Sequence, residues 1–147
     1  MENLSLKEFA AALSGKEPVP GGGGASACTG SYGCELGMMA CALTHGKKKY
    51  ACYEQDIKRI EGELAASRAT LLSWINEDAQ GFLPLSKAYG LPKDTTEQKA
   101  KKDEILEKAL HQASLTPMKI LKNSAYAMTL LDELSGKCSK LILSDVV

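Results

Sequence analysis

The chain has 147 residues, of which 44% are hydrophobic and 24% charged, which is typical of one ordinary soluble globular domain and not of a disordered or fibrous chain. Its 18 basic residues balance its 18 acidic ones, so the composition favours neither a nucleic acid nor a membrane as a partner. No apolar stretch approaches the roughly 20 residues of a membrane span, and the first residues, MENLSLKEFA, lack the pattern of a signal sequence. We therefore expect a cytoplasmic protein.

A short amphipathic helix is predicted at residues 5–13. Ser5 is a favourable N-cap, and Glu8 stands three residues later, as in a capping box. Apolar side chains then recur at helical spacing, and Gly15 marks the end of the pattern.

The stretch PVPGGGGASA, at residues 18–27, contains four consecutive glycines. Each of them loses more backbone freedom on folding than any other residue would, so the run needs a reason. A turn rich in proline and glycine that leads into a helix exposes backbone amides and lets a flat ligand approach the main chain. A flexible linker is the alternative. The GxxxxGK[ST] pattern is missing and no strand precedes the turn, so neither a Walker site nor a dinucleotide fold is predicted.

The rest of the chain is predicted to form long helices. Residues 25–43 are nearly uncharged and rich in small side chains, which indicates a helix buried on all sides. A basic break, THGKKKY, precedes a helix of up to about 40 residues that ends near Gly90 and is kinked near Gly81 or Pro84, or packs on a partner subunit. Residues 95–134 form another helix with a kink at Pro117, and residues 136–144 form a loop. Since no alternating strand pattern occurs, we expect an all-α, multihelical bundle.

Five cysteines give no CxxC pair and an odd count, which argues against a complete set of disulfides. We interpret them as small buried apolar residues, with a metal site as the remote alternative, and assign no metal ligand. The two histidines, His45 and His111, have no identifiable serine or cysteine partner, so a catalytic triad has little support.

Asp78 is the strongest candidate for chemistry. It lies three residues after Ile75 and four before Phe82, which places its carboxylate on the apolar stripe of the long helix. Desolvation raises the pKa of such a carboxylate and suits it to accept and return a proton near neutral pH. A structural aspartate, hydrogen-bonded to the backbone or to an arginine such as Arg68, is the alternative.

Lysines gather in the basic break and again after Gly90. Most are expected to belong to a solvated face. Lys93 differs because Pro92 stiffens the loop in front of it, and we consider it a candidate for holding an anionic ligand.

Six segments occur in an order that points to a known family: PVPGGGGASA, THGKKKY, INEDAQGF, YGLPKDTTEQKAKK, TPMKI and SDV. Together they resemble the C-terminal domain of formiminotransferase-cyclodeaminase and the stand-alone methenyltetrahydrofolate cyclohydrolases similar to it. The resemblance covers essentially the whole chain. It implies an all-helical, intertwined homodimer that acts on one-carbon tetrahydrofolate derivatives without a cofactor beyond this substrate.

The resemblance also implies roles for particular residues. The family's acid/base aspartate falls on Asp78, the residue that the helical spacing selects independently. It further implies that the pterin or one-carbon bridge lies against the main chain of the glycine run, and that basic and polar side chains hold the ligand or its glutamate tail. The substrate-binding residues expected on this basis are Pro20, Gly21, Gly22, Gly23, Lys48, Tyr50, Lys93 and Asp145.

The first expected activity is hydrolysis of 5,10-methenyltetrahydrofolate to 10-formyltetrahydrofolate, and the alternative is a formiminotetrahydrofolate cyclodeaminase that releases ammonia. A non-catalytic folate-binding or assembly module is the alternative from another class. Gly24 stands where the family often has serine, and Asn76 replaces the first acidic residue of its helix motif. We expect residues 1–147 to form a single domain that lacks the family's C-terminal helices.

Overall fold

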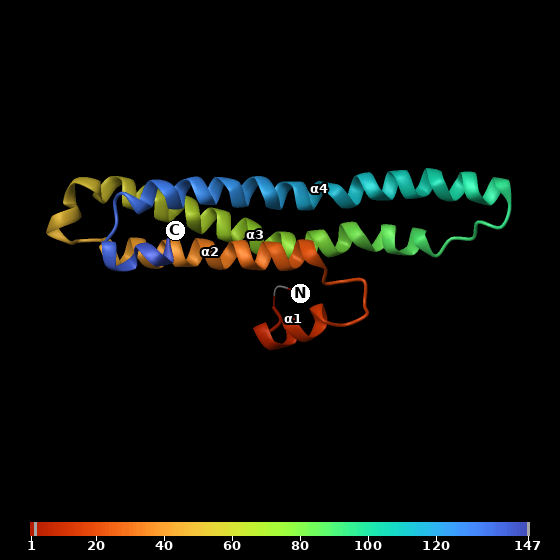
Figure 1. The fold of residues 1–147 in the computed structure, drawn as a ribbon, viewed down its shortest axis with the longest axis horizontal. Helices are drawn as coiled ribbons and strands as arrows, with labels where there is room; N and C mark the ends of the chain where they lie inside the picture. Colours follow the sequence, from red (N-terminus) through yellow and green to blue (C-terminus); the bar gives the residue numbers. More distant parts are fainter. Residues whose placement is uncertain (2, 147) are drawn as a thin grey trace. The chain divides into compact units, whose positions relative to one another are not determined.

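The computed structural model describes residues 1 and 3–146. These residues form helices and connecting turns and no strand, so the prediction of an all-α, multihelical fold is confirmed (Figure 1). The elements in chain order are α1 (Leu6–Leu13), α2 (Gly22–Thr44), the 3-10 helix η1 (Lys48–Tyr53), α3 (Glu54–Tyr89), α4 (Thr96–Ser135) and the 3-10 helix η2 (Lys140–Asp145).

The chain divides into two compact units, and each long helix contributes to both. The first unit combines Met1–Ala27 with Ser73–Ile120, and so contains α1, the first turns of α2, the second half of α3 and the first part of α4. The second unit contains the rest of α2, α3 and α4 together with η1 and η2. The prediction of a single domain stays a prediction.

Local capping explains where two helices of the first unit begin. At α1, the Ser5 hydroxyl accepts the Glu8 amide while the Glu8 carboxylate accepts the Ser5 amide. At α4, Thr95 and Gln98 exchange the same pair of hydrogen bonds. Both capping boxes use donors that the first helical turn leaves without a partner, which confirms the predicted helix starts.

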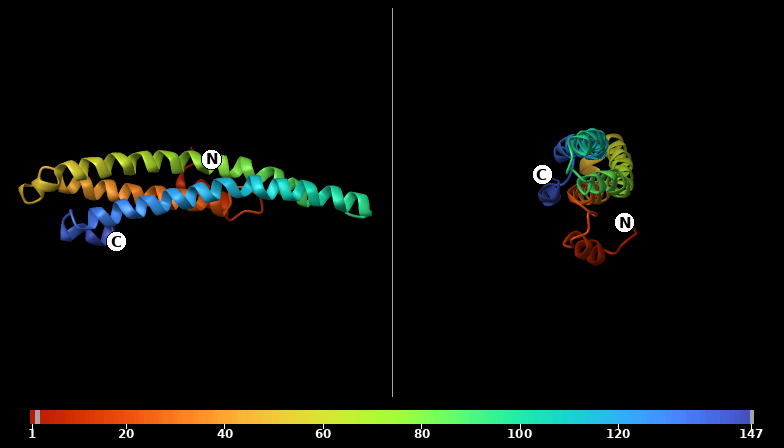
Figure 2. Two further views of the ribbon diagram at one scale, coloured as in Figure 1. Left: turned by 90° about the horizontal axis from the view of Figure 1, so that it is seen from above. Right: turned by 90° about the vertical axis from the view of Figure 1, so that its right-hand side faces the viewer.

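The two longest helices each contain a proline, Pro84 in α3 and Pro117 in α4. Helices α3 and α4 nevertheless continue to Tyr89 and Ser135, beyond their prolines. Figure 2 gives two further views of these helices. A proline has no amide hydrogen, so each one leaves the carbonyl four residues earlier without its usual helical donor. These carbonyls belong to Gln80 and Ala113.

Close packing in the second unit depends on a glycine of α2. A side chain at Gly37 would meet Leu131 Cδ2 at 2.5 Å and Leu64 Cδ1 at 2.7 Å, so α3 and α4 approach the bare backbone of α2 there. Gly33, one turn earlier, has no atom within 4 Å of the same position.

These two glycines give opposite predictions for alanine. Gly37→Ala overpacks the core and should lower the free energy of unfolding by about 1–2 kcal/mol. Gly33→Ala should raise it by up to about 1 kcal/mol, because alanine favours a helix and meets open space. Urea unfolding of the two variants, followed by circular dichroism, measures both; equal destabilisation by the two changes would contradict this packing.

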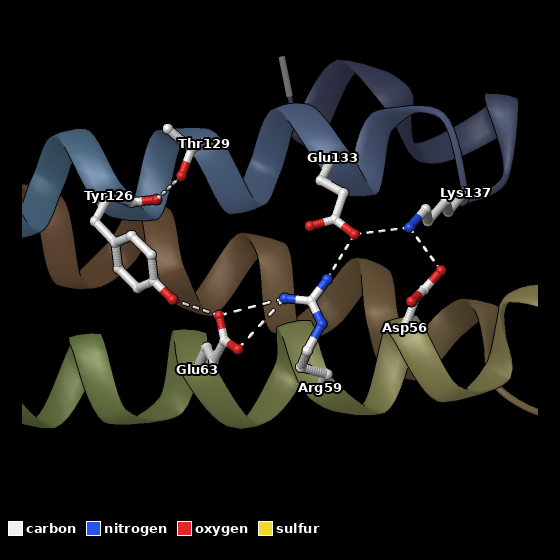
Figure 3. A network of polar contacts seen from close by, with 7 residues as sticks. All are labelled: Asp56, Arg59, Glu63, Tyr126, Thr129, Glu133 and Lys137. Atoms are coloured by element: carbon white, nitrogen blue, oxygen red, sulfur yellow. Dashed lines mark hydrogen bonds and ion pairs between the residues drawn. The ribbon is translucent and has the colours of Figure 1, made fainter.

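A charged network joins α3 and α4 on the surface of the second unit (Figure 3). Arg59 donates to Glu63 of its own helix and to Glu133 of α4, and Lys137 bridges Glu133 and Asp56. Tyr126 donates its hydroxyl to Glu63. The side chains of these ion pairs are only partly exposed, from 21% for Lys137 to 43% for Asp56. Because water still reaches them, we assign the network a modest stabilisation.

His45 lies between two carboxylates in the same unit. Its Nε2 is 2.8 Å from Glu61 and its Nδ1 is 3.1 Å from Glu54. The hydrogen bond to Glu61, followed by that to Glu54, raises the pKa of His45 above the usual 6.5, against an opposing effect of burial.

The sign of this shift fixes a pH dependence of stability. A histidine whose pKa rises on folding stabilises the fold fully below the unfolded-state pKa, near 6.5, and this contribution disappears as the pH rises through the folded-state pKa. His45→Gln should therefore lower the melting temperature clearly at pH 6 and much less at pH 9. His111→Gln, at an exposed position, serves as the control. A melting-temperature difference that is constant over this range would rule out the charged form.

Several sequence-based expectations were wrong. The glycine run was expected to precede a helix, but α2 already begins at Gly22. That helix is not buried on all sides, because Tyr32, Leu36, Met39 and Leu43 are exposed along one stripe. The stretch expected to be a loop up to Ser144 contains η2, which is held by a Ser139 cap.

The cysteines follow the prediction only in part. Cys34, Cys41 and Cys138 are buried thiols, and burial raises the pKa of each of the three, but Cys52 is exposed and Cys28 is half-buried. None of the five forms a disulfide. Exposure at Cys52 follows from its place in η1, whose residues contribute nothing to the core.

Candidate functional site

A cavity of about 220 Å³ lies in the first unit, where the proline-glycine turn meets α3 and α4. It is small compared with the pockets of about 300–1,000 Å³ that enclose a drug-sized molecule, so it fits one end of a larger ligand. Its lining combines bare main chain, one carboxylate and apolar side chains. The lining residues are Pro18, Val19, Gly21, Gly22, Gly23, Asp78, Phe82, Ala113 and Pro117.

The glycine run supplies backbone donors to this cavity. Helix α2 begins at Gly22, and the Ala25 amide donates to the Gly21 carbonyl at 3.0 Å. The first amides of a helix have no acceptor within it. One of them, from Gly24, donates to Asp78 Oδ2 at 3.1 Å, so the N-terminus of α2 and the acidic side chain of α3 meet directly.

Gly23 is required by this close approach. A side chain at this position would overlap with all three terminal atoms of the Asp78 carboxylate. A Cβ added at the neighbouring Gly22 would have no atom within 4 Å, and one added at Gly24 would make only ordinary van der Waals contacts. The glycine run therefore lets the Asp78 carboxylate reach the first turn of α2.

Asp78 has the electrostatic character that its place on the apolar stripe predicts. Burial raises the pKa of Asp78 above the usual 3.8, and the hydrogen bond from the Gly24 amide opposes this shift without cancelling it. No cation pairs with Asp78 among the described residues, and Arg68, considered as a partner from the sequence, pairs instead with Glu35 at 2.9 Å. Asp78 therefore makes the backbone hydrogen bond of the structural alternative and also has the raised pKa that suits an acid/base group.

The adjacent residue, Glu77, shows the contrast. Its carboxylate accepts hydrogen bonds from Lys119 and from the Thr116 hydroxyl, and the Lys119 ion pair holds its pKa below the usual range. Glu77 does not line the cavity. Two neighbouring carboxylates of one helix therefore have pKa values shifted in opposite directions, and only the one with the raised pKa faces the cavity.

Asn76, which departs from the family pattern, lies outside the cavity lining. Its side-chain carbonyl accepts a hydrogen bond of 2.7 Å from the Met1 ammonium group. The Asn76 oxygen is therefore already engaged in a hydrogen bond within the first unit.

The structure brings together only some of the residues predicted for the site. Gly21, Gly22 and Gly23 line the cavity together with Asp78. Pro20 and Lys93 do not line it: Pro20 is buried, and Lys93 is exposed in the α3–α4 connection. The remaining three, Lys48 and Tyr50 of η1 and Asp145 of η2, belong to the second unit, and their contact with a ligand stays a prediction.

Sequence reasoning missed five lining residues: Pro18, Val19, Phe82, Ala113 and Pro117. The first two flank the glycine run, and Phe82 follows Asp78 by one helical turn, so proximity to these features could have indicated them. Ala113 and Pro117 give no such signal, because only the packing of α4 places them at the cavity. No cluster of His, Cys, Asp and Glu suited to a metal ion occurs among the residues that the structure describes.

A family model described as formiminotransferase-cyclodeaminase matches residues 5–147. The chain belongs to this family. The family resemblance seen in the sequence is therefore confirmed, and it extends over nearly the entire chain of this formiminotransferase-cyclodeaminase family member.

Relatives of this family member carry names of folate enzymes. The methenyltetrahydrofolate cyclohydrolase of Methylorubrum extorquens is 35% identical over 143 residues, which are 97% of this chain and 69% of that protein. The formimidoyltransferase-cyclodeaminase of Mus musculus is 28% identical over 98% of this chain, which spans only 27% of the mouse protein.

A solved structure agrees with the fold. The crystal structure of formiminotetrahydrofolate cyclodeaminase from Thermotoga maritima matches 99% of this chain and 68% of its own, with a TM-score of 0.83 and 29% identity. Within the described residues, no helix is both long and apolar enough to cross a membrane.

Proposed function

We propose that this protein is a folate one-carbon enzyme that hydrolyses 5,10-methenyltetrahydrofolate to 10-formyltetrahydrofolate. The observation that carries the proposal is the Asp78 carboxylate, which faces the cavity, accepts the Gly24 amide at the N-terminus of α2 and has no cationic partner among the described residues. The relative that is named methenyltetrahydrofolate cyclohydrolase supports this choice of reaction.

In this reaction Asp78 moves one proton. A water molecule adds to the cationic methenyl carbon, forms the C–O bond and gives a proton to the Asp78 carboxylate. The protonated carboxyl then returns that proton to N5 as the C–N5 bond breaks, and the hydroxyl proton leaves to solvent as the formyl C=O forms. The raised pKa of Asp78 suits both halves of the cycle, because the group must accept a proton and also release it.

A cyclodeaminase is the second candidate, since the structural match and the mouse relative carry that name. There N10 attacks the formimino carbon and closes the five-membered ring, and the N10 proton passes through Asp78 to the formimino nitrogen. The C–N bond to that nitrogen then breaks and releases ammonia. Parallel assays distinguish the two: loss of the near-ultraviolet absorbance of methenyltetrahydrofolate, and ammonia release from formiminotetrahydrofolate. Folate binding without turnover in either assay would instead identify a binding module.

The other binding residues are part of the same proposal. The amides of Gly22 and Gly23 would lie against the pterin or the one-carbon bridge, next to the turn that contains Pro20 and Gly21. Lys48, Lys93 and Tyr50 would face the ligand or its anionic tail, and Asp145 would also contact the substrate. The reaction would need no cofactor besides the tetrahydrofolate substrate.

We also propose that the protein acts in the cytoplasm as a homodimer. The exposed stripe of Tyr32, Leu36, Met39 and Leu43 on α2 supports this assembly, because such a continuous apolar face is unusual on a monomer. Light scattering of the wild type and of Leu36→Glu tests it. A dimer that the substitution dissociates is the expected result, and a wild-type monomer would contradict it.

A further inference from the structure

Helix α4 contributes two residues to the cavity lining, Ala113 and Pro117, and the reaction above uses neither. Pro117 has no amide hydrogen, so the Ala113 carbonyl lacks the donor that residue 117 would otherwise supply. In an α-helix, the carbonyl oxygen of one residue lies next to the amide of the residue four positions later. Because Ala113 and Pro117 both line the cavity, this oxygen lies between two lining residues.

The same feature in α3 has no such surroundings. Pro84 leaves the Gln80 carbonyl without its donor in the same way, but both residues are exposed and neither lines the cavity. The described part of the first unit therefore contains two such carbonyls inside its helices, of which one belongs to a residue that lines the cavity and the other does not.

The polar groups around the cavity complement each other. The first turn of α2 contributes amide donors, Asp78 contributes a carboxylate, and the α4 part of the lining includes the residue whose carbonyl Pro117 leaves without a helical donor. A ligand that fills all three needs an acceptor edge, a reacting centre and an N–H donor edge. The reduced pterin ring of a tetrahydrofolate has such a donor edge in its ring amide N–H and its exocyclic amino group.

We propose that the Ala113 carbonyl, released by Pro117, binds the substrate by accepting a hydrogen bond from the aminopyrimidine edge of the pterin ring. This inference rests on the proposed folate function. Pro117 is then a positioning residue, because it acts through the main chain of another residue. Its role is to keep an acceptor available that an ordinary helix would use internally.

The test restores the missing donor. Pro117→Ala provides an amide that pairs with the Ala113 carbonyl, so KM for methenyltetrahydrofolate should rise about 3- to 10-fold, as for one lost hydrogen bond, with kcat unchanged. Pro84→Ala makes the same change away from the cavity and should leave KM unchanged. Hydrogen exchange should show a protected amide at residue 117 of the first variant.

Two ligands separate the hydrogen bond from simple loss of the proline ring. In one tetrahydrofolate analogue a methyl group replaces the exocyclic amino group, and in the other the ring amide nitrogen is methylated. Wild type should bind at least one of them more weakly than tetrahydrofolate, and Pro117→Ala should reduce that difference for the same analogue. An equal preference in wild type and variant, or an unchanged KM in an active Pro117→Ala enzyme, would overturn the inference and leave the proposed function intact. Absence of folate binding and turnover in wild type would overturn both.

Discussion

Asp78→Asn should lower kcat for methenyltetrahydrofolate hydrolysis by about 10²–10⁴-fold, the range typical of losing a general acid/base, with little change in KM. Asparagine has nearly the shape of aspartate and can still accept the Gly24 amide, but it cannot take a proton from water. Steady-state kinetics, followed by the loss of methenyltetrahydrofolate absorbance, measures the effect.

Two controls show that this loss is chemical. Glu77→Gln removes the neighbouring carboxylate and its Lys119 ion pair outside the cavity, so it should retain most of the activity. Asp78→Asn should also melt at the wild-type temperature or above it. A carboxyl whose pKa rises on folding destabilises the folded state when it is ionised, and this effect is complete above its folded-state pKa. The substitution removes this destabilisation. An inactive variant that is also strongly destabilised would indicate a structural aspartate instead.

Gly23→Ala should reduce kcat nearly as far as Asp78→Asn does, by about 10²-fold or more, although it removes no reactive group. Its methyl group would occupy the space of the Asp78 carboxylate, which must then move away from the Gly24 amide. The same kinetic assay measures the loss, and nuclear magnetic resonance of the Asp78 carboxyl measures the change in its environment.

Gly22→Ala is the matched comparison one residue earlier. Its methyl group meets open space, so Asp78 keeps its position and kcat should stay within about threefold of wild type, with any effect confined to KM. If both alanine variants have the same kcat, the close approach at Gly23 does not matter for the reaction.

The local rules of helix formation predicted most of the fold. The capping boxes at Ser5 and Thr95 gave the starts of α1 and α4, and the apolar spacing around Ile75 placed Asp78 on a half-buried face. These features depend on residues within one or two helical turns of each other. Sequence patterns predict such features because the interacting residues are close along the chain.

The glycine run shows where such rules fail. Glycine is a poor helix former, so residues 22–24 were expected to lie in a turn before α2. Their helical conformation is supported by a contact 54 residues away, the hydrogen bond from Gly24 to Asp78. The lining role of Ala113 and Pro117 escaped prediction for the same reason, because it depends on how α4 packs in the first unit.

The exposed stripe of α2 escaped prediction for a different reason. Composition shows that a helix is apolar, but it does not show whether that helix is covered by its own chain or by another molecule. Tyr32 and Leu36 are exposed within this chain, although the sequence around them is as apolar as a buried helix.

The dependence of kcat on pH tests most directly whether Asp78 is the proton-transfer group. The carboxylate must be ionised to accept the proton of water, so the enzyme-dependent rate of methenyltetrahydrofolate hydrolysis should fall as the pH decreases through the raised pKa of Asp78. The midpoint should lie above the usual 3.8, and the residual activity of Asp78→Asn should show no such decrease. A wild-type rate in Asp78→Asn, or the same acid decrease in both proteins, would contradict the assignment.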